Sequence, residues 1–222
     1  MASKQEEIFN CVLAGDLKNL QQHLENENGG EEAKEGVKFE FTDEMGRNAL
    51  FAACSLGRSA IVRELVKHGA RLNKCTARGY SPLHCATCWG HLETVKTLLD
   101  LGANPQAKNF RGERPVDVAK RYSHTDCADC LDLAEAKQDF LSYISYVTDT
   151  IFDRENTQGI QVKFNKEEKN KCMNACSTMS DWIQNVKNPT LSDYTAQRKH
   201  MEDTLQPILS KLSAQSAQAP AK

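Results

Sequence analysis

A repeat with a period of 33 residues runs through the middle of this 222-residue chain. Apolar positions recur at this spacing, as at Leu50, Leu83 and Val116. Such periods are typical of solenoids, in which each unit buries its apolar face against the next. The repeat therefore predicts a stack of small units in place of one central core. Glycines recur in three sets, which are Gly46, Gly79 and Gly112, then Gly57 and Gly90, then Gly69 and Gly102.

Residues 76–108 show what one unit contains. Gly79 permits the positive φ of a tight turn, and Pro82 stands where the first turn of a helix tolerates a missing N–H. Gly90 is placed to end this short helix, and Gly102 to end a second one. Each unit is therefore expected to be a turn, a helix, a second turn and a second helix, with an extended finger leading onward. The apolar stripe of the second helix consists of Leu92, Val95, Leu98 and Leu99.

The unit carries a recognisable motif, which reads Ser81-Pro82-Leu83-His84 and is followed by Ala86, Gly90 and His91. This pattern resembles an ankyrin repeat, and the resemblance implies repeats over residues 43–133. Residues 1–42 resemble a degenerate first unit that caps the stack. They hold an acidic insert at 26–36, since Gly15 precedes Gly57 by nine residues more than the period. The insert is expected to be a solvated loop, with a regulatory cover over the basic segment 58–78 as the alternative.

The period ends near residue 133, but helical patterns continue to residue 212. Asn165, with Glu168 three residues later, is a candidate helix cap. The final residues 213–222 have a small, polar composition that predicts a disordered tail. The expected fold class is therefore all-α, with an ankyrin-repeat solenoid followed by a helical bundle at 134–212.

The bundle segment resembles the lid of seventy-kilodalton heat-shock chaperones, through the spacing of Cys176, Trp182, Tyr194 and Pro207. The ATPase domain and the peptide-clamping β-sandwich of those chaperones have no counterpart here. The resemblance therefore implies no ATP-driven activity. It leaves open a nucleotide-independent holdase or co-chaperone, with exposed lid surface at Trp182, Tyr194 and Met201 as a secondary protein-binding site.

The charge balance of 28 basic and 30 acidic residues argues against nucleic acid as a partner. No apolar run approaches the ~20 residues that span a bilayer, so membrane insertion is not expected. No phosphate-binding loop or nucleophile elbow is present, so neither catalytic activity nor a cofactor is expected.

Nine cysteines without a signal peptide indicate a reducing, cytoplasmic location. Two Cys-x-x-C pairs, Cys85/Cys88 and Cys127/Cys130, have spacings that can hold zinc. Since Cys85 stands at an inward repeat position, a small apolar role is the favoured interpretation. A zinc- or redox-responsive binding protein is a third hypothesis for the whole chain.

Ankyrin arrays bind proteins along the finger tips and the exposed side of each first helix. The types found at these repeat positions are mainly aromatic residues and arginine, which are enriched at binding hot spots. The resemblance therefore implies a non-enzymatic scaffold or adaptor whose partners are other proteins, and self-association through the C-terminal helices stays open. The alternative for the aromatic residues is packing on one another or on those helices. The candidate binding residues are Met45, Arg47, Arg78, Tyr80, Trp89, Phe110, Arg111, Arg121 and Tyr122.

Overall fold

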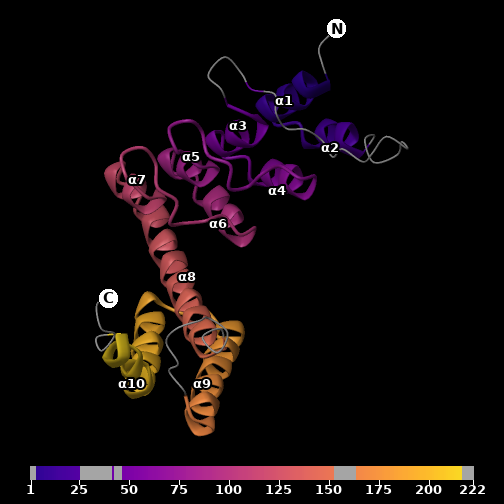
Figure 1. Cartoon of the computed structure of the whole chain (residues 1–222). Helices are drawn as coiled ribbons and strands as arrows, with labels where there is room; N and C mark the ends of the chain where they lie inside the picture. The colour runs from indigo at the N-terminus through magenta and orange to yellow at the C-terminus, as the bar shows by residue number, and fades with distance from the viewer. Residues whose placement is uncertain (1–3, 26–41, 43–46, 153–163, 217–222) are drawn as a thin grey trace, which may run out of the picture. The chain divides into compact units, whose positions relative to one another are not determined.

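The computed structural model describes residues 4–25, 42, 47–152 and 164–216 (Figure 1). The described residues form ten α-helices and two compact units, Met1–Ala134 and Glu135–Lys222. The repeat unit contains α1 (Lys4–Ala14), α2 (Leu17–Glu25), α3 (Ala49–Ser55), α4 (Ser59–Lys67), α5 (Pro82–Cys88), α6 (Leu92–Asp100), α7 (Pro115–Arg121) and the start of α8 (Thr125–Phe152). The helical unit contains the rest of α8, α9 (Lys166–Asn185) and α10 (Leu191–Ser216).

The helices of the repeat unit form two stacked layers. The first helices pack in the order α1, α3, α5 and α7, and the second helices in the order α2, α4 and α6 (Figure 1). No strand forms among the described residues, where Thr42 and Asn48 make only an isolated antiparallel bridge. This arrangement confirms the predicted all-α fold and the stacking of units.

Small and apolar side chains fill the space between the layers, in the phase that the sequence predicts. Leu50, Leu83 and Val116 are buried at equivalent positions of three successive first helices. One turn further on, alanines of the same helices are also completely buried, and their small size lets neighbouring helices approach closely. Burial of a leucine such as Leu50 or Leu83 contributes ~1.5–3 kcal/mol to the free energy of folding. These alanines are Ala53, Ala86 and Ala119.

Successive repeats are linked by one recurring hydrogen bond, and we call each such link a joint. His91 Nε2 lies 2.9 Å from the Ser55 carbonyl oxygen of the preceding unit. At the next joint, one period further on, His124 Nε2 lies 3.1 Å from the Cys88 carbonyl oxygen. Because a carbonyl oxygen only accepts, Nε2 carries the proton in both rings. At the first joint Arg58 takes the place of histidine, and its Nη2 donates to the Leu13 carbonyl oxygen over 2.8 Å.

Glycine is required beneath these rings for two separate reasons. Gly57 and Gly90 both have a φ of +70°, which side chains other than hydrogen rarely permit. A Cβ on either residue would also lie 2.7 Å from the Nδ1 atom of the next ring, which belongs to His91 or His124. The periodic glycine and the periodic histidine therefore act together, because the histidine ring packs directly against the glycine backbone.

The helical unit has its own core. Phe140 of α8 packs edge-on to Trp182 of α9, whose ring meets Tyr194 of α10 at a centroid distance of 5.4 Å. The predicted cap of α9 is confirmed, since Asn165 Oδ1 accepts from the Glu168 backbone N–H over 2.8 Å and the Glu168 carboxylate accepts in return. Other buried residues in this core are Ile144, Val147, Cys172, Met201 and Leu205.

Three predictions fall wholly or partly outside the described residues. The acidic insert 26–36 and the finger residue Met45 are not described. The disordered tail was expected from residue 213, but α10 continues to Ser216, which corrects the start of that segment. The four added residues contain no helix-breaking glycine or proline, so the helix does not end at the expected boundary.

We predict that Gly90→Ala destabilises the repeat unit more than Gly102→Ala. The control has a φ of +92° but no atom near its added Cβ, so it pays only the backbone strain of ~1–2 kcal/mol. Gly90→Ala also displaces the His124 ring and weakens its hydrogen bond, which adds ~0.5–1.5 kcal/mol. Urea unfolding followed by circular dichroism measures the difference. Equal losses in the two variants would show that the ring does not depend on this glycine.

Candidate protein-binding surface

Two described fingers project between the helix pairs, at residues 76–80 and 109–113. In each finger the first and last residues are joined, by Thr76 N–H to the Tyr80 carbonyl at 2.9 Å and by Asn109 N–H to the Glu113 carbonyl at 3.0 Å. The side chain of Asn109 also accepts from the Arg111 and Glu113 backbone N–H groups. These bonds hold the finger tips in fixed turns.

The two fingers are bonded to each other as well. The backbone N–H of Phe110 donates to the carbonyl of Arg78 over 2.9 Å. Arg78 and Arg111 stand one period apart, at equivalent places on neighbouring fingers. Their spacing is therefore set by backbone hydrogen bonds and not by flexible loops.

Large apolar side chains are exposed on this part of the repeat unit. Trp89 is 65% exposed, Phe110 58% and Tyr122 49%. Leu56, Trp89 and Tyr122 stand one period apart just after α3, α5 and α7, and all three are exposed. The exposure of Trp89 and Tyr122 does not fit the alternative in which they are buried against each other.

The candidate arginines differ in how far they are already engaged. Arg78 is exposed, and Arg111 lies over the Phe110 ring at 5.3 Å. Arg121 bonds the Glu113 carboxylate at 2.8 Å and lies over the Tyr122 ring at 4.9 Å. Arg47 is half-buried, as is Tyr80, whose ring lies 6.1 Å from that of Phe110. The structure thus brings Arg78, Tyr80, Phe110 and Arg111 together on the fingers.

The structure also shows one basic residue in a role that sequence reasoning missed. Arg58, which the sequence places in a basic flank, is a joint residue that occupies the phase of His91 and His124. The position of Arg58, one period before His91, is the sequence signal that indicates this role. Lys108 is exposed just before the second described finger.

His84 ties a first helix to the next finger. Its Nδ1 accepts from the Ser81 backbone N–H at 3.2 Å, and its Nε2 donates to the Glu113 carbonyl at 3.0 Å. Burial lowers the pKa of His84, although the Glu113 carbonyl and nearby carboxylates act in the opposite direction. A completely buried neutral ring with both nitrogens engaged is a structural tie and leaves no free nitrogen for catalysis.

The four candidate zinc cysteines lack the surroundings of a metal site. Burial raises the pKa of Cys85 to about 12, and burial also raises the pKa of Cys127 and of Cys130. A thiol held in its protonated form is a poor metal ligand and a poor nucleophile. Within the described residues, which include Cys88, no three His, Cys, Asp or Glu side chains come together to hold a metal ion.

The expected surface at Trp182, Tyr194 and Met201 is not exposed. Tyr194 and Met201 are buried, and Trp182 is half-buried between Phe140 and Tyr194. This corrects the expectation that these three residues form an accessible patch, because the helical unit uses its largest apolar groups to build its core.

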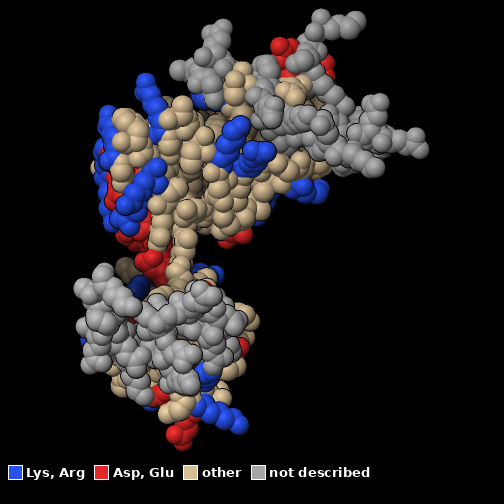
Figure 2. Space-filling model, in the orientation of Figure 1, with Lys and Arg blue, Asp and Glu red and all other residues tan. Residues whose placement is uncertain are grey.

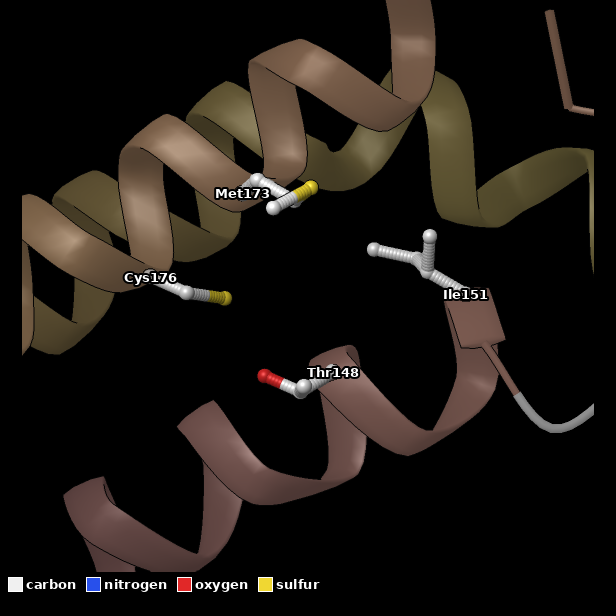
Figure 3. Close-up of a pocket in the computed structure, with 4 residues that line it drawn as sticks. All are labelled: Thr148, Ile151, Met173 and Cys176. Carbon is white, nitrogen blue, oxygen red and sulfur yellow. The ribbon is translucent and has the colours of Figure 1, made fainter. Parts of the chain in front are cut away.

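A cavity of about 130 Å³ lies in the helical unit and is lined by Thr148, Ile151, Met173 and Cys176 (Figure 3). The Thr148 hydroxyl in this cavity already donates to the Ile144 carbonyl at 2.9 Å. Burial raises the pKa of the Cys176 thiol, although Thr148 opposes the effect. The described lining holds no charged group, so it provides no recognisable chemistry.

None of the described helices combines the length and apolar character that crossing a bilayer requires.

The family model for ankyrin repeats in three copies matches residues 8–109, and the chain is an ankyrin-repeat protein. Ankyrin repeat domain-containing protein 45 of Danio rerio is 50% identical over 216 residues, which are 96% of this chain and 95% of that protein. The Homo sapiens and Mus musculus proteins of the same name are 39% and 40% identical over 207 residues, 93% of this chain and 76% and 82% of theirs. The chain belongs to the ankyrin repeat domain-containing protein 45 family.

We predict that His84 makes the repeat unit lose stability in mild acid. Its pKa is lowered in the folded chain and near 6.5 in the unfolded chain. The contribution of neutral His84 to the free energy of unfolding is therefore complete above pH 6.5. It falls as the pH drops toward the lowered pKa of the folded chain. His84→Gln should cost ~1–3 kcal/mol at neutral pH, since partners of the ring lose their bonds.

Urea midpoints measured from about pH 7.5 to about pH 5.5 should fall less steeply for His84→Gln than for the natural chain. His200→Gln, at an exposed position of α10, is the matched control and should keep the natural slope. An unchanged slope in the His84 variant would contradict the assignment.

Proposed function

We propose that this protein is a non-enzymatic scaffold or adaptor that binds other proteins through the groove side of its ankyrin repeats. Ankyrin repeats are a protein-interaction domain, and the family relationship extends over nearly the whole chain. We infer a reducing, cytoplasmic setting, because all nine cysteines are free thiols.

The observation that carries the proposal is the exposure of Trp89 and of Phe110, whose ring lies beside the Arg111 guanidinium. Exposed tryptophan is uncommon on a surface that contacts nothing, and tryptophan and arginine dominate binding hot spots. Fixed finger turns also reduce the entropy that a partner must overcome on binding.

We predict that Trp89→Ala combined with Arg78→Ala abolishes partner capture while helical content stays intact. Both side chains are exposed, so their loss leaves the core unchanged. Loss of a tryptophan hot spot costs about 2–4 kcal/mol of binding free energy. Proximity labelling and pull-down, each followed by mass spectrometry, compare the double variant with the natural chain.

The matched control is Leu191→Ala with Lys187→Ala, which removes one exposed apolar group and one cation from the helical unit. This control should retain every captured partner. If the Trp89/Arg78 variant still captures partners, the binding site lies outside the groove.

A second candidate function is a nucleotide-independent holdase or co-chaperone that uses the helical unit. The lid-like spacing of residues 134–212 suggests it, and three exposed apolar side chains, Leu141, Tyr146 and Met173, favour it. We retain self-association through the same helices as a role of this surface. These residues replace the buried Trp182, Tyr194 and Met201 as the candidates for client contact.

The holdase candidate predicts that the protein suppresses aggregation of a heat-denatured client, citrate synthase, without nucleotide. Light scattering should fall in proportion to added protein, and Leu141→Ser with Tyr146→Ser should weaken the effect, because exposed apolar groups bind unfolded chains. The Trp89/Arg78 variant should keep it. Scattering that is unchanged at excess protein would rule this candidate out.

A further inference from the structure

Positive charge is concentrated on the fingers and first helices of the last two units. Segments 74–91 and 103–122 contain only two acidic residues, Glu113 and Asp117. Figure 2 shows Lys and Arg side chains gathered at the edge of the repeat unit where α7 lies in Figure 1. This local excess stands against a net charge of -2 for the chain. The basic residues of these segments are Lys74, Arg78, Lys108, Arg111, Arg114, Lys120 and Arg121.

The two local carboxylates are already engaged by cations other than those of the fingers. Glu113 is paired with Arg121 at 2.8 Å, and Asp117 with Arg114 at 3.2 Å. Lys120 is paired with Asp132 of α8 at 3.1 Å. Four exposed cations therefore face solvent without a carboxylate from these segments, and they are Lys74, Arg78, Lys108 and Arg111.

Three of these cations, Arg78, Lys108 and Arg111, belong to the two bonded fingers or adjoin them, together with one aromatic ring. We define the finger edge as Arg78, Lys108, Phe110 and Arg111. The Phe110 ring is exposed beside the Arg111 guanidinium, and its backbone is bonded to Arg78. The edge therefore offers charge and apolar surface in alternation, on a backbone that does not have to be ordered on binding.

We propose that the finger edge binds an acidic segment of a partner protein, in which aromatic or aliphatic residues alternate with carboxylates. This inference rests on the proposed function and adds to it the chemistry of the partner. Carboxylates bond the guanidinium groups of Arg78 and Arg111, and an apolar side chain covers Phe110. Trp89, at the far end of α5 from the finger, provides a separate apolar anchor.

A protein segment fits this edge better than nucleic acid does. Nucleic-acid sites neutralise several phosphates in succession and draw on a larger basic surface. Here three cations stand on a chain with a net negative charge. Since screening limits charge effects to about 8 Å at physiological salt, the edge acts on groups that touch it and not on a distant polyanion.

The test begins with selection of a displayed library of random peptides against the full chain. Recovered peptides should be enriched in Asp and Glu beside apolar residues. Their affinity, measured by fluorescence anisotropy on synthetic copies, should fall as salt is raised. Arg78→Glu with Arg111→Glu should weaken binding about tenfold or more, since two charge-assisted bonds become repulsions.

The matched control is Lys18→Glu with Lys96→Glu, which makes the same change of net charge at exposed positions of the second helices α2 and α6. It should leave the affinity within about twofold, because surface charges beyond the screening length contribute little. Circular dichroism verifies that each variant is folded.

Several outcomes would overturn the inference. These are recovered peptides without an acidic excess, no recovered peptides, affinity unchanged by the Arg78/Arg111 reversal, or tighter binding of a single-stranded oligonucleotide that this reversal abolishes. Binding of neutral peptides that is lost on Trp89→Ala but insensitive to salt would retain the groove function and remove only its acidic specificity. Insensitivity to both variants would contradict the two proposals together.

Discussion

The repeat unit depends on a contact between an imidazole ring and a backbone without a side chain. At the joints of Gly57 with His91 and of Gly90 with His124, the ring approaches so closely that a Cβ would overlap it. The same ring then bonds a carbonyl at the end of the preceding first helix. Since each repeat buries its apolar face only against its neighbours, these joints help to set the positions of the two described fingers.

The joints explain why the proposed binding surface can be both exposed and rigid. The apolar face of each first helix is buried at positions such as Leu83 and Ala86, so the finger and the opposite side of the helix remain free for contact. Backbone bonds within and between the fingers fix the separation of Arg78 and Arg111. A surface that is already ordered would favour the proposed binding of a partner, because less conformational entropy is lost on association.

Much of the fold could be predicted from the sequence, because period, glycine and proline are local signals. Pro82 begins α5 as expected, and Asn165 caps α9. The helical unit was harder, since a helical stripe does not reveal which helix will cover it. Tyr194 and Met201 have the residue types of a contact surface, but they are buried by partners distant in the sequence.

The candidate site was predictable in its positions but not in its electrostatics. The period places Trp89 and Tyr122 at equivalent exposed points, and both are exposed. It cannot show that Arg121 is bound to Glu113 while Arg78 is not, because that depends on side-chain contacts across the fingers. Arg58 shows the same limit, since its charge suggested a surface role and its geometry makes it a joint.

The histidines of the repeats differ in the hydrogen bonds that their two ring nitrogens make. His91 and His124 each use Nε2 as a donor to a carbonyl oxygen at the end of the preceding first helix. His84 accepts at Nδ1 from the Ser81 N–H, and a second proton there would place two donors face to face. Protonation of His84 should therefore disturb the start of α5 at Ser81, while the N–H at Nε2 that holds the Glu113 carbonyl of the next finger is retained.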